Sequence, residues 1–141
     1  MENIDVLTRV LENRPKPDDW FKTITTPITK KSFLVFKHNK YVTVPTENIA
    51  FFYVKHGSTL LVSLNQQEYA LNYSLDQIQS LVPDQQFYRL NRQYLINFSV
   101  VKEVERYFSR KLLVQLTVPA PDTLLVTKEK VSSFLQWLGD R

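Results

Sequence analysis

From residue 32 onward the chain alternates short apolar runs with polar turns, and this pattern restricts it to a mostly-β fold. The stretches 37–40 and 55–58 are typical hairpin turns, and Gly57 can supply the positive φ that such turns require. Asn97 suits a turn that closes a strand. Because these connections are short, neighbouring strands should pair as antiparallel hairpins. The predicted strands span 33–36, 41–44, 49–54, 59–64, 68–73, 87–90, 94–97, 100–108, 112–118 and 123–126.

Two short helices are predicted between and after the strands. Ser74 and Gln77 have the spacing of a capping box, and the helix that they open should end before Pro83. Thr127 can cap a final helix, which Gly139 would end. The apolar face of this final helix is predicted at Val131, Phe134, Leu135 and Leu138.

Residues 1–31 differ from the rest of the chain and form a separate arm. A short amphipathic helix is predicted over about 3–13, and the prolines that follow it end the helix. Such an arm cannot bury a core alone, so we expect 1–31 to be a linker and 32–141 to be the folded domain.

The composition excludes several classes of function. The chain has no cysteine, which rules out disulfides, thiolate zinc sites and a cysteine nucleophile. Its two histidines, His38 and His56, fall in predicted turns, and its two glycines cannot form a glycine-rich phosphate loop. We therefore expect no enzymatic activity, no metal and no cofactor. No apolar run reaches the ~20 residues that span a bilayer and no signal peptide opens the chain, so a soluble cytoplasmic protein is expected.

The segment 87–97 carries the residues most suited to recognition. Arg89, Asn91 and Arg92 lie there between apolar residues, and their side-chain types bind phosphates and the base edges of guanine and adenine. The net charge of the chain is +4, and residues 86–111 alone hold an equal excess of positive charge. If a polyanion binds, this region should face it.

Further basic residues lie at the ends of predicted strands, and each has a second interpretation. Lys55 and His56 fit an ordinary polar hairpin as well as a binding loop. Lys128 and Lys130 fit a solvated helix face as well as a phosphate site at the start of a helix. Arg89 fits a structural arginine that pairs with carboxylates or carbonyls as well as a phosphate contact.

Three stretches carry a family resemblance: Ile49-Ala-Phe-Phe-Tyr, Phe87-Tyr-Arg-Leu-Asn-Arg-Gln-Tyr-Leu-Ile-Asn97 and Val126-Thr-Lys-Glu-Lys-Val-Ser-Ser-Phe. The middle stretch is the most specific, with Phe-x-Arg followed by a polar pair, an aromatic residue, two aliphatic residues and Asn. In order and spacing these motifs resemble the LytTR-type DNA-binding domain of the LytR/AlgR family of bacterial response regulators. The resemblance covers about three-quarters of the chain.

The resemblance implies elongated antiparallel β-sheets with short helices, in which loops and strand ends approach DNA. It implies sequence-specific double-stranded DNA binding by the output domain of a two-component transcription regulator, on repeated half-sites where two copies can form a dimer. An upstream receiver domain and a sensor kinase are implied partners; the arm 1–31 holds no receiver, so we expect an excised C-terminal piece, with a stand-alone regulator as the alternative. The implied DNA-facing residues are Lys55, His56, Arg89, Asn91, Arg92, Lys128 and Lys130.

Within this set, Asn91 and Arg92 are expected to read bases, because Arg can bridge guanine and Asn can bridge adenine. Arg89, Lys128 and Lys130 would contact phosphates. A protein-interaction module in signalling is the alternative function, and single-stranded nucleic-acid binding is a third. The alternative would use exposed aromatic residues such as Tyr41, Tyr53 and Tyr107.

Overall fold

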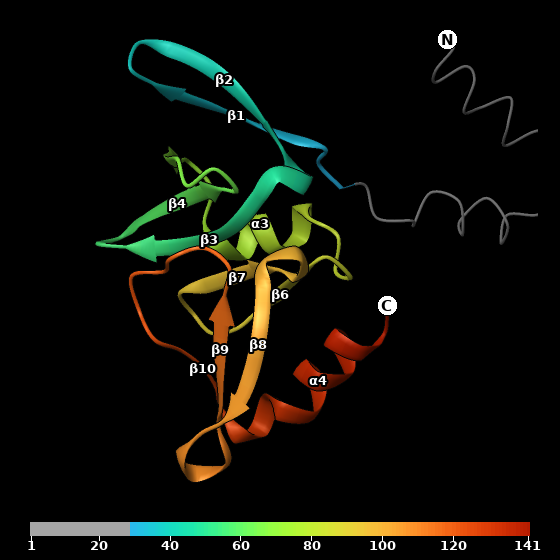
Figure 1. Cartoon of the computed structure of the whole chain (residues 1–141). Coiled ribbons are helices and arrows are strands. Elements are labelled where there is room, and N and C mark those ends of the chain that lie inside the picture. The colour runs from blue at the N-terminus through green and yellow to red at the C-terminus, as the bar shows by residue number, and fades with distance from the viewer. Residues whose placement is uncertain (1–28) are drawn as a thin grey trace, which may run out of the picture.

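The computed structural model describes residues 29–141 (Figure 1). The helix expected over 3–13 lies outside the described residues, and so does most of the 1–31 arm. Three antiparallel sheets and two helices make up the described part, which confirms the mostly-β prediction. No helix in 29–141 is both long enough and apolar enough to cross a membrane.

The elements follow the predicted order along the chain. The strands are β1 Ser32–Lys37, β2 Lys40–Pro45, β3 Ile49–Lys55, β4 Ser58–Ser63, β5 Glu68–Leu71, β6 Phe87–Arg89, β7 Tyr94–Asn97, β8 Val101–Arg106, β9 Leu112–Leu116 and β10 Leu124–Val126. The helices are α3 Leu75–Leu81 and α4 Val131–Gly139, and the short 3-10 turns are η1 Thr46–Asn48, η2 Phe98–Val100, η3 Phe108–Arg110 and η4 Lys128–Lys130.

A five-stranded sheet with the order β5-β4-β3-β7-β6 forms the centre of the domain. The strands β10, β9 and β8 form a second sheet, and β1 and β2 form a hairpin of their own. Every pairing is antiparallel. The two central neighbours β3 and β7 are far apart in sequence, and Tyr53 is paired with Tyr94 across them.

Successive side chains of the central strand β3 point to opposite faces of the sheet, and those on both faces are buried. Phe51 and Tyr53 belong to a core that also contains residues of β8–β10 and α4. Ile49 and Phe52 belong to a second core, with the β1–β2 hairpin and α3. Each fully buried side chain of this size contributes about 1.5–3 kcal/mol to folding. The central sheet therefore has a hydrophobic core on each of its faces.

The hairpin turns use left-handed residues with almost no glycine. His38 and Asn39 join β1 to β2 with φ of 54° and 63°, and His56 and Gly57 join β3 to β4 with φ of 51° and 78°. The positive φ expected at Gly57 is confirmed. Two successive residues of this kind match the right-handed twist of the strands that they connect.

Helix α3 begins as predicted. The main-chain N–H of Gln77 donates to Ser74 Oγ at 3.1 Å, and the Gln77 side chain accepts from the Ser74 N–H at 2.8 Å. This reciprocal pair is the capping box, and the helix ends before Pro83.

The predictions for the last helix need three corrections. Thr127 makes no side-chain cap, because the 3-10 turn η4 lies between it and α4, whose N-cap is Lys130. Leu135 is 47% exposed, and Phe134 is the fully buried residue of the helix. Gly139 is the last helical residue and not a left-handed residue beyond the end. The helix therefore ends where expected but without a glycine cap.

Candidate nucleic-acid interface

Two of the predicted DNA-facing segments lie side by side at one end of the central sheet. Strand β3 ends at Lys55 and its antiparallel neighbour β7 begins at Tyr94, so the turn 55–58 and the loop 90–93 meet at the same edge. The N–H of Val54 donates to the main-chain oxygen of Gln93 at 3.0 Å. This bond joins the end of β3 to the loop.

The third segment is attached to the same loop by a lysine. Lys130, in η4, donates from Nζ to the main-chain oxygens of Arg89 at 3.1 Å and of Leu90 at 3.4 Å. These partners are neutral carbonyls, so they do not compensate the charge of the lysine at the edge of the sheet. The structure thus brings together all three segments that the family resemblance singled out.

The guanidinium of Arg89 binds other groups of the protein. Its Nε donates to the main-chain oxygen of Asn91 at 2.6 Å and its Nη2 to that of Arg92 at 3.1 Å. Its Nη1 lies 2.7 Å from Asp76 Oδ1 and 2.9 Å from Gln79 Oε1, both on α3. These four contacts favour the structural interpretation of Arg89, which holds the loop against the helix.

Asn91 shapes the loop through its side-chain oxygen. Asn91 Oδ1 accepts hydrogen bonds from the main-chain N–H groups of Gln93 at 2.8 Å and of Tyr94 at 2.9 Å. An asparagine that binds the backbone two residues ahead forms an Asx turn. Both lone pairs of the oxygen are used in this way, so only the amide N–H₂ remains to meet a ligand.

Arg92 stands at the tip of the loop with its side chain exposed. Lys55, His56 and Lys128 are exposed on the neighbouring segments. Within residues 29–141, none of these four side chains forms a hydrogen bond or an ion pair, and the ion pair of Arg89 with Asp76 is the only one described. Glu129 is the one acid on these three segments, so the edge presents a net positive charge to solvent.

Comparison with known proteins identifies the family of this chain. The sequence model of the LytTr DNA-binding domain matches residues 39–139. This chain belongs to the LytTR family. A solved structure described as the LytTr DNA-binding domain of a methyl-accepting/DNA response regulator from Bacillus cereus has the same fold, with a TM-score of 0.67 and 19% identity. The match covers 78% of this LytTR chain and 98% of the other chain, while no curated protein matches significantly.

Two stacked tyrosines lie beneath the edge of this LytTR domain. The rings of Tyr53 and Tyr94 are 5.5 Å apart at 16°, and both are buried. Tyr53 donates to Glu68 and Tyr94 donates to Asp122 Oδ2 at 2.7 Å. Burial, together with the hydrogen bond to Glu68, raises the pKa of Tyr53 to about 12, and the pKa of Tyr94 is raised by burial and by Asp122.

The tyrosine pair changes two expectations. Tyr53 is only 3% exposed, so its place among the exposed aromatics of a protein-interaction module was wrong. Asp122, which fixes the loop before β10 to the base of the interface, was missed by sequence reasoning. A lone aspartate after Pro121 looks like an ordinary turn residue, and only the folded structure places it beside Tyr94.

Asn97 is fully buried at the far end of β7. Its Oδ1 accepts from the N–H of Ser99 at 2.9 Å and its Nδ2 donates to the main-chain oxygen of Ile49 at 2.7 Å. The prediction of a turn residue that closes the strand is confirmed, and the residue also links β7 to β3.

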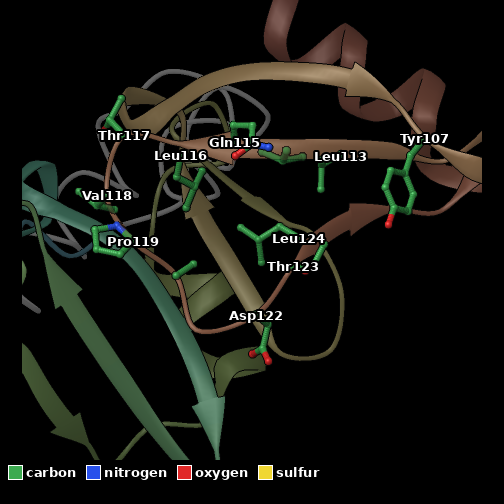
Figure 2. Close-up of a pocket in the computed structure, with 12 residues that line it drawn as sticks. Tyr107, Leu113, Gln115, Leu116, Thr117, Val118, Pro119, Asp122, Thr123 and Leu124 are labelled. Carbon is green, nitrogen blue, oxygen red and sulfur yellow. The ribbon is translucent and has the colours of Figure 1, made fainter.

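A groove of about 560 Å³ lies between β9 and the chain segment 117–123 (Figure 2). Tyr107 stands at one end of it and Pro119 at the other, and Asp122 lines it. Its lining is otherwise aliphatic and polar, without a histidine or a basic residue. No group of three or more metal-ligating side chains occurs in the described part of this LytTR domain.

Proposed function

We propose that this LytTR domain binds double-stranded DNA in a sequence-specific manner through the edge formed by the turn 55–58, the loop 90–93 and η4. The single observation that supports it most is the convergence of these segments, with Arg92 exposed at their centre. The family is a DNA-binding one, and the exposed side chains at the edge include the cations Lys55, Arg92 and Lys128, against a single acid, Glu129.

Each side chain would have a distinct role on DNA. Arg92 reaches into the major groove and bridges O6 and N7 of a guanine. Lys55, His56 and Lys128 contact phosphates on either side. Asn91 acts mainly by shaping the loop, since its side-chain oxygen is already bound, and its amide N–H₂ can donate to a base acceptor.

The wider setting follows from the same proposal. The domain serves as the output domain of a two-component transcription regulator, downstream of a receiver domain and a sensor kinase. Two copies, as a dimer on DNA, occupy repeated half-sites of one operator.

Selection of bound sequences from a random duplex pool tests the proposal. We expect an enriched motif with repeated half-sites and an affinity that falls steeply with salt, because phosphate contacts release counterions. Arg92→Ala should cost about 1–3 kcal/mol of binding free energy and relax one position of the motif. Gln93→Ala, on the same loop and also exposed, is the matched control. An unenriched pool, or an Arg92→Ala variant with wild-type affinity and motif, would contradict the assignment.

A protein-interaction function without DNA is the second candidate. It is favoured by one observation, the exposure of Leu34, Phe36 and Tyr41 on the outer face of the β1–β2 hairpin. The same titration separates the two functions, because a protein contact through apolar side chains would leave duplex DNA unbound at both low and high salt.

A further inference from the structure

The hairpin between β8 and β9 ends in a tip that combines cations with exposed rings. The tip comprises residues 106–111, with the cations Arg106, Arg110 and Lys111. Phe108 is 75% exposed, more than any other large apolar residue described. Tyr107 is 39% exposed, and its ring meets that of Phe108 at 5.0 Å in a T-shaped contact.

The register of the second sheet places this tip beside the candidate interface. Val126 of β10 is paired with Leu112 of β9, and Leu112 is paired with Arg106 of β8. The chain leaves β10 at Val126 and enters η4 two residues later. Lys128 therefore emerges next to the base of the tip, and Figure 1 shows the β8–β9 loop beside the start of the C-terminal helical segment.

Within residues 29–141, no carboxylate forms an ion pair with the cations of the tip. Glu103 and Glu105 are the nearest acids along β8, yet neither forms an ion pair with a described residue. The turn is held by its own backbone, with the N–H of Tyr107 donating to the Lys111 oxygen at 2.9 Å. The exposed side chains of Arg106, Phe108 and Arg110 are thus available to a ligand, and the tip places further cations next to Lys128.

We propose that the tip is a second DNA-contacting element that grips the duplex beside the segment read by Arg92. Arg106, Arg110 and Lys111 bind phosphates, and Phe108 enters the adjoining minor groove. An apolar side chain flanked by arginines is a common device of minor-groove binding. A groove about 6 Å wide admits a single ring on a narrow turn but not a helix. This inference rests on the proposed DNA binding.

The experiment compares tip variants on two labelled duplexes. Both carry the selected motif, one with long flanks and one trimmed to the motif itself. The variants are Phe108→Ala and the double substitution Arg110→Gln with Lys111→Gln. Tyr41→Ala, an equally exposed ring on the β1–β2 hairpin, and Lys40→Gln are matched controls. Melting temperatures of all variants should stay near the wild-type value. Every substituted side chain is exposed except that of Lys111, which is half-buried and makes no side-chain hydrogen bond or ion pair within residues 29–141.

On the long duplex, each tip variant should lose about 5- to 30-fold in affinity, and the double variant should also lower the salt slope by about two. On the trimmed duplex the variants should match the wild type. Hydroxyl-radical footprints should lose protection only in the flanking minor groove. Wild-type affinity and footprint on long flanks, or equal losses on both duplexes, would overturn the tip assignment and leave the main interface standing. A wild-type chain that binds neither duplex would overturn both proposals.

Discussion

Arg89 holds the backbone of Arg92 in place, because Arg89 Nη2 donates to the main-chain oxygen of Arg92 at 3.1 Å. The same Arg89 binds the oxygen of Asn91 and reaches Asp76 and Gln79 on α3. One arginine thereby fixes the backbone from which another arginine can meet a ligand. Positioned supports of this kind keep a binding side chain close to its productive geometry.

Replacing Arg89 should disturb the loop as well as the fold. Arg89→Ala removes donors from the oxygens of Asn91 and Arg92, and we expect a loss of about 1–3 kcal/mol in the free energy of unfolding. Urea denaturation measures this loss. Arg89→Lys should restore little of it, because an ammonium cannot reproduce the planar fork of donors. Asp76→Asn is a control with a small effect, since that carboxylate is 86% exposed.

Asn91 offers a test that separates loop shape from base recognition. Asn91→Asp keeps an oxygen acceptor for the N–H groups of Gln93 and Tyr94, so thermal stability should remain near the wild-type value. Asn91→Ala loses both bonds and should be less stable by about 1–2 kcal/mol. On DNA, the aspartate should bind more weakly because it adds negative charge near phosphates. Equal stability of the two variants would contradict the role of the Asx turn.

Lys128 and Lys130 should behave differently despite their proximity. Lys128 is exposed, so Lys128→Ala should lower the salt slope of DNA binding by about one without changing the melting temperature. Lys130 is bound to the oxygens of Arg89 and Leu90, so Lys130→Ala should also lower the melting temperature. Scanning calorimetry and anisotropy titrations at several salt concentrations measure both effects. Identical behaviour of the two variants would argue against the positioning role of Lys130.

The stability of the domain should decline in alkaline solution through Tyr53. Its pKa is raised from 10.0 to about 12, so the folded state favours the protonated phenol. This contribution is complete below pH 10 and is lost as the pH rises toward 12, with a size of roughly 2–3 kcal/mol. Urea unfolding at pH 9 and pH 11 should show a smaller decline in Tyr53→Phe than in the wild type. A parallel decline in both proteins would rule out this tyrosine as the cause.

Local patterns in the sequence predicted most of the fold. The β1–β2 and β3–β4 hairpins and the capping box at Ser74 each depend on a few neighbouring residues, and all are present. Errors fell at the start of α4, where η4 precedes the helix and leaves Thr127 without a capping role. Whether the first turn after a strand is 3-10 or α depends on packing against other elements, which no local pattern records.

The candidate site was only partly accessible from sequence. A charged or amide side chain near a strand end suits a ligand, a carbonyl or a turn equally well, and composition cannot choose among them. Arg89 and Asn91 proved to bind their own backbone, and the partners of Arg89 on α3 are brought near only by the fold. The convergence of the three segments depends on the pairing of β3 with β7, strands that lie about 40 residues apart.

Strand β7 lies between β3 and β6, so the candidate interface is lost when the domain unfolds. Because the edge exists only when these distant strands are paired, a fragment that lacks either β3 or β7 cannot form it. The proposed DNA binding would therefore be thermodynamically linked to global folding, and duplex DNA should raise the melting temperature of the whole domain. A conservative change at buried Phe52 would lower the folded population, and with it the proposed DNA binding, without altering any side chain of the edge.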